Sequence, residues 1–212
     1  MSKKSIKDEE SIEKASGDGE QQPLKHVAIF ASGAGSNAQK IIDHFKNSAF
    51  VKIALIVCNK PGAGVLAIAA NENIPVLMIE KKLFNDTGYI EELKSYHIEF
   101  IILAGFLWKV PSVLINEFTG RIVNIHPALL PSYGGKGMYG NAVHAAVLAA
   151  NEKQSGITIH FVDDKYDHGE IIFQAQCPVD ENETAESLAQ KIHVLEHRYY
   201  PGEIEKLLAK NN

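Results

Sequence analysis

Short apolar runs alternate with segments of helical spacing through most of the chain. The runs HVAIFAS, VKIALIVCN, PVLMIE, FIILAGF and RIVNIH lie between residues 26 and 126 and are rich in Val, Ile and Leu. Between them, apolar residues recur at helical spacing near 37–47, 64–72, 87–96 and 113–118. Strands that are apolar on both sides are typical of a sheet covered by helices on both faces. The pattern predicts an α/β fold with a doubly wound, mainly parallel, Rossmann-like sheet.

The last third of the chain predicts an antiparallel addition to this sheet. After a helical segment near 142–151, the runs GITIHFVD and EIIFQAQCPV are separated by a short polar loop, which favours antiparallel pairing. A final helix is expected from about 185 to 200. Residues 1–24 are charged and almost free of apolar side chains, so a disordered tail is expected there, with 25–212 forming a single domain.

Composition narrows the function without defining it. The chain has 212 residues, 45% of them hydrophobic, and a formal net charge of −5, which suits one globular domain. No basic face indicates nucleic acid, and no apolar run approaches the roughly 18 residues of a membrane helix. The two cysteines are far apart and no secretory leader is evident, so we expect a cytoplasmic protein. A monomer or homodimer is expected.

Polar side chains follow the strand RIVNIH at its end. Asn124 and His126 are two residues apart, so they should project from the same face of the strand. About 40 residues later, Asp167 lies in a polar loop where it could orient and charge an imidazole. An amide donor beside a histidine can stabilise a developing oxyanion, which suggests acyl transfer. The simpler alternative is that each residue is a turn or capping residue.

A glycine-rich turn, ASGAGSNAQKII, follows the first strand and opens a helix. Gly33 and Gly35 permit close backbone approach, the helix N-terminus favours an anion, and Asn37 adds a donor, so a phosphate is the expected ligand. The letters also fit a weak dinucleotide fingerprint. That alternative requires an acidic residue at the end of the second strand, where this chain has Cys58, Asn59 and Lys60. A tight turn without a ligand is the third possibility.

Two further segments border the predicted cleft. LAGFLWKVP leaves Leu107, Trp108, Lys109 and Val110 at the carboxyl edge of the sheet, where a flat ring could stack and bond to the backbone. Trp108 could equally pack on a neighbouring helix. HVLEH places His193 and His197 one helical turn apart with Glu196 between them, the order of one class of metallopeptidase. No third ligand is evident, so no metal is expected.

The segments NIHPALLP and GITIHFVDDKYDHGEIIFQ resemble the signature regions of the folate-dependent formyltransferases, and the resemblance extends from about His26 to the C-terminus. It implies a formyltransferase fold, 10-formyltetrahydrofolate as co-substrate and the amine of 5-phosphoribosylglycinamide as acceptor, in purine biosynthesis. The implied ribonucleotide-binding residues are Gly35, Ser36, Asn37, His193 and Glu196. The implied folate-binding residues are Leu107, Trp108, Lys109, Val110, Asn124 and Asp163.

The resemblance also implies the chemistry. The amine attacks the formyl carbon directly, Asn124 donates to the formyl oxygen, and His126 is kept protonated by Asp167, with no metal. A cis peptide is implied between Leu130 and Pro131. The chain differs from some relatives at Trp108, where they carry a basic residue, and in its longer GGKGMYG loop.

Three rivals remain. A formyltetrahydrofolate hydrolase would share the catalytic residues but is expected to carry a further N-terminal domain, and a tRNA formyltransferase a C-terminal RNA-binding domain. A non-catalytic nucleotide-binding module would need the glycine turn alone.

Overall fold

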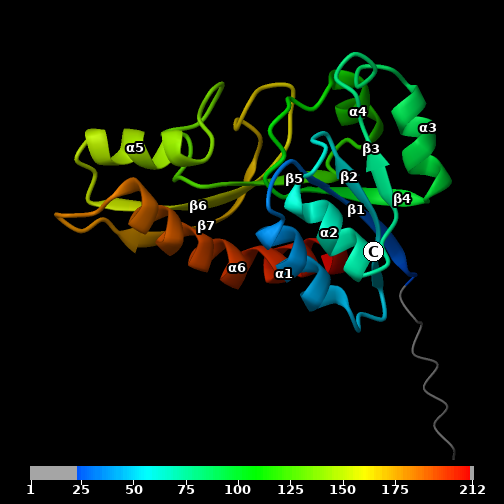
Figure 1. Ribbon diagram of the computed structural model, residues 1–212, viewed down its shortest axis with the longest axis horizontal. Coiled ribbons are helices and arrows are strands. Elements are labelled where there is room, and N and C mark those ends of the chain that lie inside the picture. Colours follow the sequence, from blue (N-terminus) through cyan, green and yellow to red (C-terminus); the bar gives the residue numbers. More distant parts are fainter. Residues whose placement is uncertain (1–22, 211–212) are drawn as a thin grey trace, which may run out of the picture.

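The computed structural model describes residues 23–210, in which helices cover both faces of a seven-stranded sheet (Figure 1). The strands are β1 (Lys25–Ala31), β2 (Val51–Cys58), β3 (Val76–Met78), β4 (Ile98–Leu103), β5 (Ile122–His126), β6 (Gln154–Phe161) and β7 (Ile171–Pro178). The helices are α1 (Ser36–Phe45), α2 (Gly64–Asn71), α3 (Gly88–Ser95), α4 (Ser112–Glu117), α5 (Asn141–Ala149) and α6 (Ala185–Lys210).

The strand order is β3-β2-β1-β4-β5-β6-β7. The first five strands pair in parallel, whereas β6 is antiparallel to β5 and β7 is antiparallel to β6. This confirms the predicted doubly wound sheet with an antiparallel C-terminal addition. The chain reverses its direction of winding between β1 and β4, and open α/β sheets bind ligands outside the carboxyl ends of strands at such a point.

Alternate residues of β1 enter two separate apolar cores. Val27 and Ile29 of β1 pack with α1, α2 and α6, whereas Ala28 and Phe30 pack with α3 and α4 on the other face. Figure 1 shows the same division, with α1, α2 and α6 on one side of the sheet. On β5, Val123 and Ile125 belong to the first core, so the residues between them point to the opposite face.

The final helix is longer than predicted. An end near residue 200 is wrong, because α6 continues through Pro201 to Lys210. Proline removes a helical hydrogen bond, but Tyr200, Ile204 and Leu208 follow one another at helical spacing and are all buried. The Tyr200 hydroxyl also donates to the Leu103 carbonyl oxygen at 2.9 Å. Burial of this apolar face explains why the helix continues past its proline.

Two strands are shorter than the apolar runs that predict them. PVLMIE contributes the three residues of β3, and β4 ends at Leu103, two residues before Gly105, which has φ +72°. The apolar lip that follows is therefore a loop and not a continued strand. The predicted tail lies almost entirely outside the described residues. Within residues 23–210, no helix is long and apolar enough to cross a membrane.

Candidate active site

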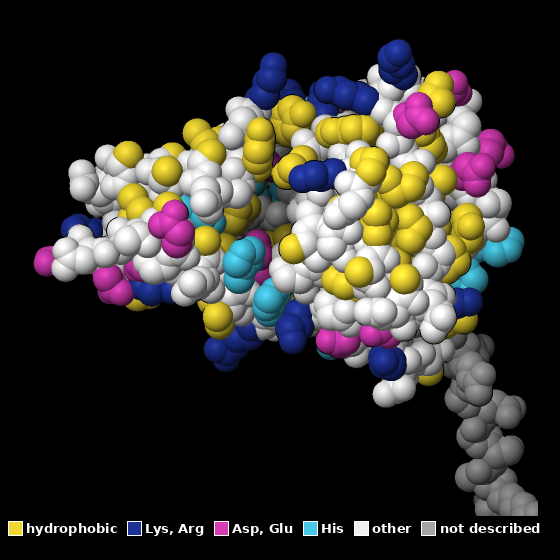
Figure 2. Space-filling model, in the orientation of Figure 1, with side chains coloured by type: hydrophobic (Ala, Val, Ile, Leu, Met, Phe, Trp, Pro, Cys, Tyr) yellow, Lys and Arg dark blue, Asp and Glu magenta, His cyan; other side chains and the backbone are white. Residues whose placement is uncertain are grey.

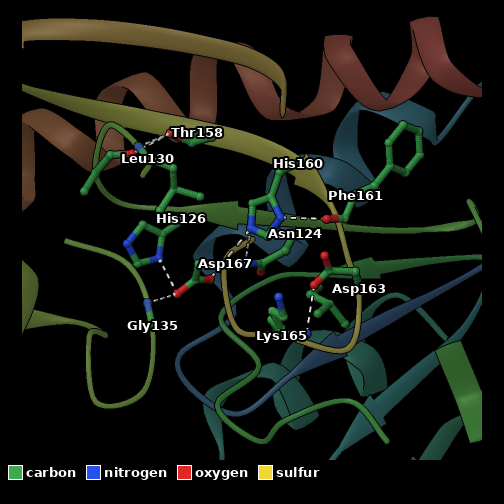
Figure 3. A network of polar contacts seen from close by, with 12 residues as sticks. Asn124, His126, Leu130, Gly135, Thr158, His160, Phe161, Asp163, Lys165 and Asp167 are labelled. Carbon is green, nitrogen blue, oxygen red and sulfur yellow. Dashed lines mark hydrogen bonds and ion pairs between the residues drawn. The ribbon is translucent and has the colours of Figure 1, made fainter. Parts of the chain in front are cut away.

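Asn124 and His126 project together from the end of β5. Antiparallel pairing places Asn124 opposite His160 and His126 opposite Thr158 on β6, so these side chains share one face of the sheet. The loop after β6 brings Asp167 over them, and Figure 3 shows the side chains directed toward one another. The structure thus brings together the three residues that the sequence pattern predicts as catalytic.

His126 is buried, with 3% of its surface exposed, and both ring nitrogens face acceptors. Its Nε2 lies 2.8 Å from the Tyr133 carbonyl oxygen, which can only accept, so Nε2 carries a proton. Its Nδ1 lies 3.6 Å from Asp167 Oδ2. Asp167 Oδ2 also accepts a hydrogen bond from the Gly135 backbone N–H at 2.8 Å, which holds the carboxylate beside the ring.

Sequence reasoning missed His160, the fourth polar residue of this cluster. Its Nδ1 lies 2.7 Å from the Phe161 carbonyl oxygen, so Nδ1 carries the proton and Nε2 is the acceptor in the neutral ring. Nε2 lies 3.1 Å from Asn124 Nδ2, which must donate. Burial lowers the pKa of His160, which favours this neutral form. His160 therefore fixes which way the Asn124 amide points. The strand alternation of GITIHFV is the signal that could have found it.

A cavity of about 350 Å³ opens in front of these side chains. All six residues predicted to bind the folate line it: Leu107, Trp108, Lys109, Val110, Asn124 and Asp163. The Trp108 ring also packs against Phe84 and Phe106, with ring centres 5.8 and 6.3 Å apart. Trp108 thus serves the core and the cavity wall together.

The longer GGKGMYG loop forms another wall of the same cavity, with residues 135–140 lining it. Gly135, Gly137 and Gly140 have positive φ values, which glycine adopts without strain. Because Gly135 donates to Asp167, the loop is connected directly to the predicted catalytic carboxylate. The peptide bond between Leu130 and Pro131 is cis, as the resemblance implies.

The predicted ribonucleotide residues gather between α1 and α6. Asn37 Nδ2 and His193 Nδ1 each lie 2.9 Å from Glu196 Oε2, and Ser36 is exposed at the start of α1. The bond to Glu196 raises the pKa of His193. Asn37 Oδ1 is buried without a hydrogen-bond partner. The contact between Asn37 and Glu196 joins residues 159 positions apart.

The backbone conformation and the packing at position 35 require glycine. Its φ is +85°, and a Cβ there would lie 2.8 Å from Ile68 Cδ1 and 3.0 Å from the Val65 backbone. Gly35 is buried, whereas Gly33 is exposed and a Cβ there would meet nothing within 4 Å. The open approach to this turn is therefore at Gly33, and Gly35 shapes the turn.

The metallopeptidase alternative finds no support in the contacts of HVLEH. Glu196 Oε2 accepts from Asn37 as well as facing His193, so Glu196 links α6 to α1 in this structure. Across residues 23–210, no group of three His, Cys, Asp or Glu side chains could hold a metal ion.

The sequence reasoning also missed His144, a buried imidazole with an unpartnered Nδ1. Burial lowers its pKa, and the charges that act on it include Glu196, His193 and His126.

An open α/β sheet that presents an amide, an imidazole and a carboxylate at its carboxyl edge defines an enzyme suited to acyl-group transfer. The formyl transferase family matches residues 25–204, and the chain belongs to that family.

Relatives share most of this chain. It is 39% identical over 195 residues to phosphoribosylglycinamide formyltransferase of Bacillus subtilis, covering 89% of this chain and 97% of that protein. It is also 39% identical to the trifunctional purine biosynthetic protein adenosine-3 of Drosophila melanogaster, covering 88% of this chain and 14% of that protein. The crystal structure of phosphoribosylglycinamide formyltransferase from Bacillus halodurans has a TM-score of 0.80 and 39% identity, covering 89% of this chain and 97% of that one.

Proposed function

We propose that this chain transfers the formyl group of 10-formyltetrahydrofolate to the primary amine of 5-phosphoribosylglycinamide, giving formylglycinamide ribonucleotide and tetrahydrofolate in purine biosynthesis. The observation that carries the proposal is the convergence of Asn124, His126 and Asp167 on one cavity. The names of the relatives support phosphoribosylglycinamide as the acceptor of the formyl group.

The cavity walls suit a formyl folate. Phe106, Val110 and Val162 offer apolar surface to a flat pterin, and residues 107–110 line the cavity, where their backbone carbonyl groups can accept hydrogen bonds. The folate supplies a formyl group on a nitrogen that becomes the leaving group. No metal is required, because no step needs a Lewis acid.

Asn124 and His126 stabilise the negative charge that develops on the formyl oxygen. Asn124 Nδ2 has two hydrogens, and His160 accepts one of them. The other is available to the cavity. The protonated His126 adds a nearby positive charge in a buried site, where electrostatic stabilisation is strongest.

Asp167 keeps His126 charged and assists the proton transfers. Direct attack by the amine requires no enzyme nucleophile, but the amine must lose a proton and the folate nitrogen must gain one. Asp167 lies beside His126 at the catalytic cavity. Directly or through water, it moves this proton from the amine to the folate nitrogen. Gly135 holds the carboxylate in place.

The ribonucleotide binds at the glycine turn and α6. The N-terminus of α1 and the exposed Gly33 favour binding of the ribonucleotide phosphate. Glu196 accepts hydrogen bonds from the hydroxyl groups of the ribonucleotide. Ser36, Asn37 and His193 complete this subsite, with Gly35 shaping the turn. The cytoplasmic location, the absence of nucleic-acid and membrane partners, and the monomeric or homodimeric state remain predictions.

The test is an absorbance assay of folate deformylation with and without 5-phosphoribosylglycinamide. Turnover that depends on the ribonucleotide supports the transferase. Equal turnover without it would instead identify a formyltetrahydrofolate hydrolase, and no turnover by the folded protein would favour a binding module. Extensive chelation should leave the activity intact, whereas loss on chelation and recovery with zinc would return attention to HVLEH.

A further inference from the structure

Residues 133–135 contact both members of the predicted catalytic pair His126 and Asp167. The Tyr133 carbonyl oxygen lies 2.8 Å from His126 Nε2, and the Gly135 N–H donates to Asp167 Oδ2 at 2.8 Å. His126 ends β5, whereas Asp167 lies on the loop after β6, so this short segment connects side chains from two different elements. A displacement of its backbone would therefore move the imidazole and the carboxylate relative to each other.

The segment has an unusual backbone and little support from outside. Tyr133 has φ +58°, in the left-handed region that residues other than glycine rarely adopt, and Gly135 has φ +99°. The next two residues, Lys136 and Gly137, are exposed. Figure 2 shows the surface hollowed beside the region that α5 occupies in Figure 1. Contacts on the inner side of the segment must therefore hold it, and the Tyr133 side chain supplies one of them.

The Tyr133 side chain is fixed at its far end by Glu152. The Tyr133 hydroxyl donates to Glu152 Oε1 at 2.7 Å. Glu152 directly follows the turn that closes α5, where its N–H donates to the Val147 carbonyl oxygen at 3.3 Å. The Asn151 N–H donates to the Leu148 carbonyl oxygen at 3.0 Å, and Asn151 has φ +53°. Such a pair of bonds is typical of a helix C-terminus, so the end of α5 places the Glu152 backbone.

A small cavity of about 90 Å³ borders the same side chain. Tyr133, Val147, Glu152 and Ser155 are among the residues that line it, and Ser155 Oγ is buried without a hydrogen-bond partner. A side chain beside empty space lacks packing contacts on that side. Packing alone therefore leaves the Tyr133 ring room to move, and the hydroxyl bond to Glu152 restricts that movement.

We propose that Glu152 is a positioning residue for catalysis, which acts by holding Tyr133. Through the backbone of residues 133–135, it keeps His126 and Asp167 in the geometry that formyl transfer needs. The inference rests on the proposed function. Glu152 does not line the catalytic cavity, so its loss should change kcat and leave both KM values nearly unchanged. A charged acceptor strengthens the hydrogen bond, but the pair is exposed to solvent, so a moderate effect is expected.

The experiment removes the bond from each end. Tyr133→Phe deletes the hydroxyl and keeps the ring, and Glu152→Ala deletes the acceptor. Each should lower kcat about five- to tenfold with both KM values within about twofold of wild type. The double variant should be no slower than either single variant, because both substitutions remove the same bond.

Two matched variants separate this role from a merely structural one. Glu152→Gln keeps an oxygen that can accept from the Tyr133 hydroxyl, so its kcat should stay within about twofold of wild type. Glu181→Ala should leave kcat unchanged, because Glu181 is an exposed glutamate that lines neither the small cavity nor the catalytic one. A loss of kcat in Glu152→Gln as large as that in Glu152→Ala would overturn the inference.

Hydrogen exchange at the Gly135 amide, followed by NMR, gives a readout that needs no turnover. Tyr133→Phe and Glu152→Ala should each speed this exchange about tenfold, while exchange at Ile29 in the buried strand β1 stays the same. Unchanged kcat or unchanged Gly135 exchange in both variants would overturn the inference, as would an equal acceleration at Ile29. If wild type transfers no formyl group, the proposed function fails, while the exchange comparison still tests whether Glu152 holds the segment.

Discussion

Asp167→Asn tests the proposed chemistry with little change of shape. The Gly135 N–H can only donate, so the new amide oxygen takes the place of Oδ2 and keeps that bond. The amide nitrogen then takes the place of Oδ1, which lies 3.7 Å from His160 Nε2, and Nε2 keeps its hydrogen bond from Asn124. The substitution therefore removes the negative charge while the bond to Gly135 persists.

The size of the effect follows from the distance between Asp167 and His126. Two unit charges 3.6 Å apart interact with roughly 4.6 kcal/mol at an effective dielectric constant of about 20. The hydrogen bond from Gly135 disperses part of the carboxylate charge, so the full amount is an upper limit. We expect kcat to fall between about a hundredfold and a few thousandfold, since each 1.36 kcal/mol is about tenfold in rate.

The assay is ribonucleotide-dependent deformylation at neutral pH, with kcat and both KM values determined. Asp164→Asn is the matched control, because Asp164 lies on the same loop and bonds to the exposed Ser112 outside the catalytic cluster. His126→Ala should be similarly slow, and the double variant with Asp167→Asn should be far less than additive. Near wild-type kcat in Asp167→Asn would remove the carboxylate charge from the mechanism.

Three further outcomes follow from the contacts. His160→Phe removes the acceptor of the Asn124 amide, so kcat should fall about ten- to hundredfold with little change in KM, and an unchanged kcat would contradict the role of His160. Because burial lowers the pKa of His160, the wild type should lose this hydrogen bond and its activity only on the acid side of the ordinary histidine range. Glu196 raises the pKa of His193, so the stability that this pair contributes is fully present below about pH 6.5 and is lost as the pH rises through the raised pKa. The thermal unfolding midpoints of His193→Ala and wild type should therefore differ most near pH 6 and converge by pH 9. Gly33→Val should fold normally and raise the ribonucleotide KM at least about tenfold. Gly35→Val should unfold more readily, because position 35 has a φ of +85° and a Cβ there would contact Val65. Equal stability of the two variants in a denaturant titration would refute this distinction.

The sheet was predictable because its strands are buried on both faces. Continuous apolar runs such as VKIALIVC need no knowledge of their neighbours to be recognised. The last helix was not predictable to its end, since the cost of Pro201 is visible in the sequence and the burial of Ile204 and Leu208 is not. Local signals thus placed the elements, and tertiary packing decided where one of them stopped.

The three predicted catalytic residues could be selected from the sequence because polar residues at the end of an apolar strand are recognisable. Asn124 and His126 interrupt an apolar strand with polar groups at a spacing of two. His144 leaves no comparable signal, because an isolated histidine in an apolar helix resembles an ordinary core residue, and His160 could be found only from the alternation of its strand. Gly35 shows a different difficulty, since a glycine required by φ and packing has the same sequence pattern as one required by a ligand.

The orientation of Asn124 depends on a feature that no motif records. The pairing of β6 with β7 shifts register between Ile159 and His160, where β7 carries the extra residue Ile172. At that position the His160 ring reaches the carbonyl oxygen of the next residue, Phe161, which places the proton on Nδ1 and leaves Nε2 as the acceptor. Asn124 must then present its amide nitrogen, the group that can donate to an oxyanion, on this side of the cleft. The backbone carbonyl bonded to His160 on β6 thereby sets the donor on the neighbouring strand β5, and replacing His160 should disturb catalysis even where the predicted catalytic residues are unchanged.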